Sequence, residues 1–197
     1  MKDRDAAAGE RLRGRERELD AVASDLRLNR SVLLVGPASI GKSAIARAVT
    51  SPGVILLDPF ERVGRLDAGR LRQRLDRGHV ALATARERSV RDIGAVGRVL
   101  WRFHTIVVPP LAAISIRQIL VDVFSESRTR PGVMPSAWWT EAIAAADGRP
   151  GLAVLIARVT VRSLARTGRW PTPGLIVIDH RIDGAVRWTR PRSKTRS

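Results

Sequence analysis

Short apolar runs alternate with amphipathic stretches along the first 110 residues of the chain. The apolar runs are as long as strands, and they cover residues 32–35, 54–58, 79–84 and 105–108. The stretches with apolar side chains at helical spacing cover residues 11–30, 44–49, 65–77 and 91–103. Runs that are apolar throughout are typical of strands buried on both faces. Because strands that alternate with helices form parallel sheets, the pattern predicts an α/β fold with about four core strands.

The pattern changes after Pro110. Helical spacing predicts three helices over 111–124, 136–146 and 150–165, which would form a small helical domain. Farther along, the apolar runs at 175–178 and 185–188 flank a turn at Asp183-Gly184. Two such runs around a turn predict a β-hairpin.

The first predicted strand leads into a loop with a phosphate-binding pattern. Gly36 and Gly41-Lys42-Ser43 match G-x-x-x-x-G-K-[ST] between a strand and a helix. Glycines let backbone N–H groups converge on phosphate oxygens, the helix N-terminus adds more, and the lysine reaches the terminal phosphates. An ordinary glycine-rich turn is the alternative, but the apolar strand before the motif and the helix after it favour the P-loop. The residues that we expect to bind the nucleotide phosphates are Gly36, Pro37, Ala38, Ser39, Ile40, Gly41, Lys42, Ser43 and Ala44.

Two oxygen-bearing side chains are candidates for holding Mg²⁺. The Ser43 hydroxyl occupies the P-loop position that ligates the ion. Asp58 ends the second apolar run, and functional groups gather at the carboxyl ends of parallel strands. We therefore interpret Asp58 as the Walker B aspartate, which acts on the metal directly or indirectly during catalysis. A turn or helix-capping aspartate before Pro59 is the alternative.

The composition of the chain limits which metal ligands, cellular location and partners it can have. The chain has no cysteine, which excludes disulfides and cysteine-ligated metals. Its apolar runs are too short to cross a membrane and its first residues lack the apolar core of a signal peptide, so we expect a cytoplasmic protein with no membrane partner. The formal net charge of +16 favours polyanions such as nucleic acid. Arginines spread over solvated faces are the plainer explanation.

Taken together, the motifs resemble the STAND class of AAA+-like P-loop ATPases, the signalling NTPases near NB-ARC and LuxR/MalT-type regulators. Besides the P-loop and the Walker B strand, the resemblance rests on Gly14-Arg15-Glu16-Arg17-Glu18, Thr84-Ala85-Arg86 and Gly148-Arg149-Pro150. It implies ATP and Mg²⁺ as ligands. It also implies that Arg15 lies near the adenine, that Arg86 reads the γ-phosphate during catalysis, and that Pro150 packs near the base. A charged helix start, a solvated arginine and a plain interhelical turn are the respective alternatives.

Two departures from that family bear on activity. Asp58 follows Lys42 by only 16 positions, where relatives place another strand and helix, so this chain lacks one βα unit. Pro59 stands where a catalytic glutamate often follows the Walker B aspartate, and the nearest other carboxylates are Glu61 and Glu87. Without a carboxylate that orients water, hydrolysis should be slow.

The residue pattern and the resemblance, which covers about residues 11–166, together predict four parts of the chain. They are a flexible N-terminus (1–10), a P-loop ATPase core (11–110), a helical lid (111–170), and a hairpin with a basic tail (171–197).

We expect an ATP-binding switch or weak ATPase. A DNA-associated AAA+ ATPase of the replication, transposition or transcription-regulator type is one alternative, and a non-hydrolysing interaction module is another. The net charge and the basic tail, in which Trp188 lies among arginines, favour contact with nucleic acid. A nucleotide-dependent oligomer, and Arg98 or Arg102 as an arginine finger, are further hypotheses.

Overall fold

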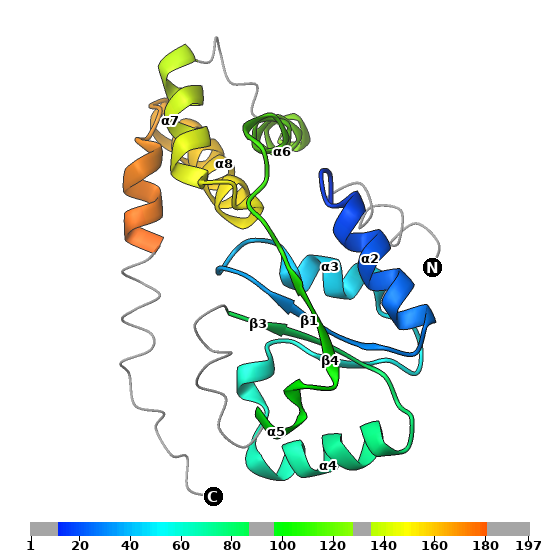
Figure 1. Cartoon of the computed structure of the whole chain (residues 1–197). Coiled ribbons are helices and arrows are strands. Elements are labelled where there is room, and N and C mark those ends of the chain that lie inside the picture. The colour runs from blue at the N-terminus through cyan, green and yellow to red at the C-terminus, as the bar shows by residue number, and fades with distance from the viewer. Residues whose placement is uncertain (1–11, 87–96, 128–134, 181–197) are drawn as a thin grey trace, which may run out of the picture. The chain divides into compact units, whose positions relative to one another are not determined.

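The chain consists of two compact units, of which the first ends at Leu111 and the second begins at Ala112. Figure 1 shows the computed structural model, which describes residues 12–86, 97–127 and 135–180. The predicted flexible N-terminus (1–10) and the basic tail lie outside these ranges.

Four parallel strands form the sheet in the described part of the first unit. They are β1 (Ser31–Val35), β2 (Ile55–Leu57), β3 (Ala81–Ala85) and β4 (Phe103–Val107), in the order β2-β3-β1-β4. β1 pairs with both β3 and β4, so that Leu33 lies opposite Ala83 and Thr105. The prediction of an α/β fold with four parallel strands is confirmed, and the strand that leads into the P-loop is central.

Helices cover both faces of this sheet (Figure 1). The helices of one face are α2 (Glu16–Arg27) and α3 (Lys42–Val49); those of the other are η1 (Phe60–Arg62), α4 (Arg65–Asp76) and α5 (Gly97–Leu100). Successive side chains of a strand point to opposite faces, so β1 contributes to two cores. Val32 and Leu34 pack with α2 and α3, whereas Leu33 and Val35 pack with α4 and α5.

Two elements of the sheet unit depart from the sequence pattern. The helix predicted over 91–103 extends too far, because α5 ends at Leu100 and Phe103 already belongs to β4; residues 91–96 lie outside the described residues. The apolar run at β2 predicts a strand buried on both faces, but Leu56 is 37% exposed. β2 lies at the edge of the sheet, where β3 is its hydrogen-bonded neighbour.

The described part of the second unit is helical. α6 (Ala113–Glu126), α7 (Ser136–Ala146) and α8 (Pro150–Thr167) pack on one another. An aromatic cluster joins them, in which Trp138 meets Phe124 and Trp170 at centroid distances of 5.6 and 5.2 Å. None of the described helices has the length and apolar character that crossing a membrane requires.

The predicted β-hairpin is wrong in its first strand. Residues 173–180 are helical, and residues 185–188, the predicted second strand, lie outside the described residues. Ile176 and Val177 are both buried, while Leu175 and Ile178 are at least half exposed. A strand would bury alternate residues, so this pattern follows a helix face. Tertiary packing has overridden the strand propensity of β-branched residues, and the Trp138 indole fixes the preceding turn by donating to the Pro171 carbonyl at 3.1 Å.

Candidate functional site

The loop between β1 and α3 is built for close backbone approach. A Cβ added to Gly36 would lie 3.0 Å from the Val108 carbonyl oxygen, which follows β4. Gly41 is the N-cap of α3 and has a φ of 102°, in the left-handed region that glycine tolerates. Ile40 is fully buried beneath the loop, while Ala38 and Ser39 are exposed. The glycines of the motif therefore stand where larger residues would clash or strain the backbone.

The Lys42 side chain lies under this loop rather than in solvent. It is 9% exposed, and its ammonium group donates to the carbonyl oxygens of Gly36 at 2.7 Å and Pro37 at 2.8 Å. Burial lowers the pKa of Lys42, and Arg86 also lowers it, whereas Glu61 and Asp58 act in the opposite direction. An anion at the loop would replace the carbonyls as partners of this cation.

Asp58 is held by hydroxyl groups from two other elements. Its Oδ1 accepts hydrogen bonds from Ser43 Oγ of α3 at 2.8 Å and from Thr84 Oγ1 of β3 at 2.5 Å. Its Oδ2 lies 3.8 Å from an Arg47 guanidinium nitrogen. The two residues predicted to hold Mg²⁺ thus touch each other at the N-terminus of α3. Oxygen donors of this kind suit Mg²⁺.

Thr84 is a site residue that sequence analysis did not single out for its hydroxyl. It is 1% exposed, in a strand that is otherwise apolar. A threonine near the carboxyl end of an apolar strand is the sequence signal that could have indicated this residue. Its hydrogen-bond partner, Asp58, could not be predicted in the same way, because the contact depends on β2 and β3 being neighbours.

Arg86 and Glu61 lie together at the carboxyl end of β3. The Arg86 backbone N–H donates to Glu61 Oε1 at 2.7 Å. Glu61 belongs to the short helix η1, which the fully buried Phe60 fixes against Phe103 at a centroid distance of 5.7 Å. The spare carboxylate nearest to Asp58 in sequence is therefore close to the P-loop lysine, whose pKa it raises.

Arg15 is buried at the start of α2, with 2% of its surface exposed. Its guanidinium donates to the carbonyl oxygens of Ile40 at 2.9 Å and Pro109 at 2.7 Å, and to Glu18 Oε1 at 3.0 Å. Arg15 thus ties the P-loop to the segment after β4. These contacts account for most of its donors, and contact with an adenine stays a prediction.

Pro150 belongs to the second unit, where it begins α8 after a turn. Asp147 and Gly148 both have positive φ values in this turn, and Arg149 donates to the Asp147 carboxylate at 2.9 Å. The predicted contact of Pro150 with a base stays a prediction.

Solved structures with the same fold are found among AAA+ P-loop ATPases. The ORC1 protein of Aeropyrum pernix, solved in complex with DNA, is 18% identical with a TM-score of 0.62, over 91% of this chain and 69% of that one. The RuvB Holliday junction branch migration motor of Thermotoga maritima is 15% identical with a TM-score of 0.56, over 83% and 66%. The Aeropyrum pernix ORC2 protein, solved as ADPNP and ADP complexes, is 12% identical with a TM-score of 0.57, over 87% and 69%.

These likenesses, together with the four-stranded parallel sheet and the helices on both of its faces, show a P-loop NTPase fold. The chain spans about two thirds of the length of the solved proteins that it matches. No family model and no curated protein matches its sequence.

Proposed function

We propose that the chain binds ATP with Mg²⁺ at the P-loop and acts as a nucleotide-dependent switch or weak ATPase. The observation that carries the proposal is the contact of Ser43 with Asp58 at the N-terminus of α3, beside the buried Lys42. It places two oxygen donors for a cation next to a backbone loop and a lysine that suit phosphates.

Each residue has a distinct role in this proposal. Lys42 exchanges its two loop carbonyls for phosphate oxygens, which restores a charged partner to a buried ammonium group. Ser43 and Asp58 hold the metal, which supplies charge neutralisation to the phosphates when bound. Thr84 keeps the Asp58 carboxylate oriented, and Arg86 distinguishes ATP from ADP at the γ-phosphate.

Slow turnover follows from the residue after Asp58. Pro59 has no group that accepts a proton from water. Glu61 is the described carboxylate that replaces it best, since it lies beside Arg86 and acts on Lys42. The hydrogen bond that Glu61 accepts from the Arg86 backbone N–H reduces its freedom to orient water.

We further propose that the chain is a reduced member of the STAND type, located in the cytoplasm. The Gly14–Glu18 box and the helical second unit support this assignment. Arg15 then serves the site by fixing the P-loop, through its bond to Ile40. A nucleotide-dependent oligomer belongs to the same proposal.

A titration with a fluorescent ATP analogue and Mg²⁺ tests the binding proposal. Lys42→Ala should weaken binding by roughly 10- to 100-fold, the range expected for a hydrogen bond to a charged group. Arg70→Ala, which removes an 81% exposed cation from α4, is the matched control and should bind normally. Equal affinities in all three proteins would overturn the P-loop assignment.

Association with nucleic acid is a second candidate function. The formal net charge of +16 favours it, and two of the proteins with this fold are described as a branch migration motor and as a complex with DNA. The test is salt-dependent binding of labelled DNA by the wild-type chain and by a variant with the tail residues Arg190, Arg192, Lys194 and Arg196 replaced by serine. Absence of binding at low salt excludes this function.

ATP binding without phosphate release would instead indicate a non-hydrolysing interaction module.

A further inference from the structure

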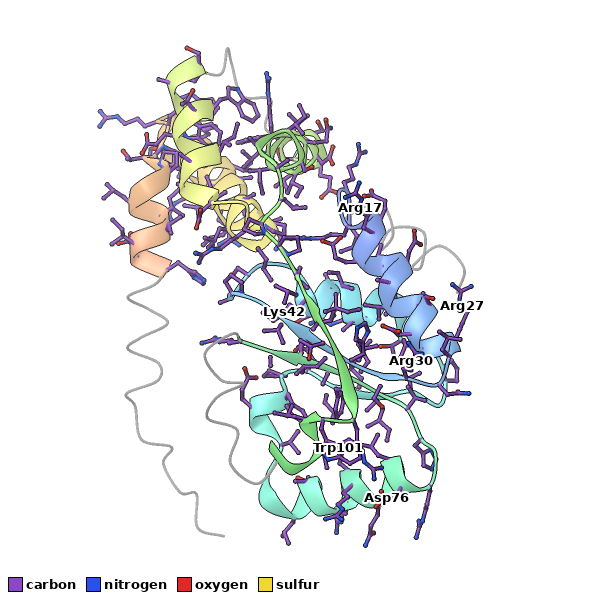
Figure 2. The ribbon with its side chains drawn as sticks, viewed as in Figure 1. Arg17, Arg27, Arg30, Lys42, Asp76 and Trp101 are labelled. Carbon is purple, nitrogen blue, oxygen red and sulfur yellow. The ribbon has the colours of Figure 1, made fainter. Side chains whose placement is uncertain are left out.

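A cavity of about 460 Å³ lies at the amino-terminal ends of the strands, at the opposite edge of the sheet from the P-loop. Three chain segments converge there: the segment between α2 and β1, the segment between α4 and β3, and the start of β4. The side chains that line the cavity include Asn29, Arg30, His79, Trp101, Arg102 and His104. Figure 2 shows Trp101 and Asp76 at this end of the unit, away from Lys42.

Trp101 is the unusual feature of this cavity. The indole is 76% exposed, although Phe103, two residues later, is buried in the core. The guanidinium carbon of Arg102 lies 4.9 Å from the centre of the Trp101 ring. With so much of its surface exposed, the indole offers a flat apolar face on the side that Arg102 does not cover. Tryptophan is enriched at interfaces, where its ring can pack on a partner while its edge stays in a polar setting.

Two arginines that line the cavity, Arg102 and Arg30, each lie within ion-pair distance of a carboxylate. A guanidinium nitrogen of Arg102 lies 2.5 Å from Asp76 Oδ1, and the Arg102 side chain is 27% exposed, so this ion pair orients a group that carries five N–H donors. Arg30, 64% exposed, lies 3.8 Å from Asp25, which also accepts from His104 Nδ1. A guanidinium group oriented as that of Arg102 is can meet phosphate oxygens at a low cost in side-chain entropy, and Arg30 adds a more exposed positive charge at the same cavity.

We propose that this cavity binds single-stranded nucleic acid, with a base stacked on Trp101 and phosphates contacting Arg102 and Arg30. A flat aromatic ring beside oriented guanidinium groups matches the alternating bases and phosphates of a single strand. The formal net charge of +16 supports a polyanion rather than a neutral peptide. The proposal rests on the second candidate function, association with nucleic acid, and it does not require a nucleotide at the P-loop.

The test measures the anisotropy of a fluorescein-labelled 20-mer of deoxythymidine with the full chain at low and moderate salt. Trp101→Ala should weaken binding by roughly 5- to 100-fold, as expected for loss of one stacked base, whereas Trp101→Phe should retain most of the affinity. Arg102→Ala should weaken binding and flatten the dependence on salt, because one phosphate contact is lost. Arg70→Ala and Leu66→Ala, whose side chains are 81% and 85% exposed on α4, are the controls for charge and for apolar surface.

Trp101 also provides a direct signal. The other four tryptophans are Trp138, Trp139, Trp170 and Trp188, outside the sheet unit. Stacking should quench the part of the fluorescence that Trp101→Phe removes. ATP binding by Trp101→Ala should equal that of the wild type, and Lys42→Ala should still bind the oligonucleotide.

Three results would overturn the proposal. The first is no binding of the oligonucleotide at low salt. The second is equal binding by the wild type, Trp101→Ala and Arg102→Ala, which would leave association with nucleic acid intact but move it elsewhere, for example to the basic tail. The third is Trp101-dependent binding of an acidic protein with no binding of the oligonucleotide, which would make the cavity a protein interface.

Discussion

Replacing Arg15 with alanine should destabilise the P-loop more than it affects recognition of the base. The buried guanidinium donates to the carbonyl oxygens of Ile40 and Pro109. Hydrogen bonds from charged groups contribute about 1.5–3 kcal/mol each. The loss of two such hydrogen bonds corresponds to about 3 kcal/mol or more of local stability. Water that enters the vacated space can donate to the same carbonyl oxygens, so the loss should stay close to about 3 kcal/mol. Arg15→Lys should recover only part of the stability lost in Arg15→Ala, because one ammonium group cannot replace a forked guanidinium group that reaches both carbonyl oxygens.

Hydrogen exchange read by mass spectrometry gives the local measurement. Amides of β1, from Ser31 to Val35, should exchange about 100-fold faster in Arg15→Ala, since 1.36 kcal/mol corresponds to a factor of ten. Arg17→Ala, which removes an exposed arginine from α2 (Figure 2), is the matched control and should leave exchange unchanged.

Nucleotide binding separates loop support from contact with the adenine. If Arg15 supports the loop, Arg15→Ala lowers the affinities for ATP and for inorganic tripolyphosphate by the same factor. A loss confined to ATP, with unchanged exchange in β1, would refute the supporting role and favour the contact with the base that the sequence resemblance implies.

The remaining predictions concern the phosphate end of the site. Burial lowers the pKa of Lys42, and a bound phosphate should raise this pKa again, so that ATP binding takes up a proton between the two pKa values. ATP affinity measured by calorimetry should therefore fall as the pH rises from the pKa of the free protein to that of the complex. Lys42→Met should remove this pH dependence. Asp58→Ala should abolish Mg²⁺-dependent phosphate release, whereas turnover of tens per second in the wild type would contradict the slow mechanism. Glu61→Gln should reduce phosphate release without weakening ATP binding, and an unchanged rate would exclude Glu61 as the water-orienting group. Arg86→Ala should weaken ATP more than ADP in the same titration, and equal weakening would make Arg86 structural.

Local sequence was sufficient for the features that depend on spacing alone. The P-loop pattern requires glycine at defined positions, and Gly36 and Gly41 stand where the backbone is crowded or left-handed. The period of the apolar residues predicted the bounds of α7 and the start of α8, and the proline in the first turn of α8 stands where such a helix begins. Ser136 is the first residue of α7 but not its N-cap, because Pro135 holds that position and no side chain caps the helix.

The contacts that assemble the site could not be predicted in the same way. The Thr84 hydroxyl reaches Asp58 because β3 lies beside β2, and Glu61 reaches Arg86 because Phe60 fixes η1 in the core. These contacts join residues about 25 positions apart, so no local period encodes them. Arg15 is the extreme case, since a run of charges predicts solvent and the structure buries its guanidinium between two carbonyls.

The short interval between Lys42 and Asp58 has a structural consequence at the site. It leaves β2 at the edge of the sheet, paired with β3 over three residues and with Leu56 partly exposed. An edge strand of this length constrains its carboxyl end weakly, because each further neighbour would add a ladder of hydrogen bonds. The Asp58 carboxylate is nevertheless anchored by Ser43 and Thr84, which lie in α3 and the more central β3. Side-chain hydrogen bonds from Ser43 and Thr84 to the Asp58 carboxylate therefore secure Asp58 where the edge strand alone would not.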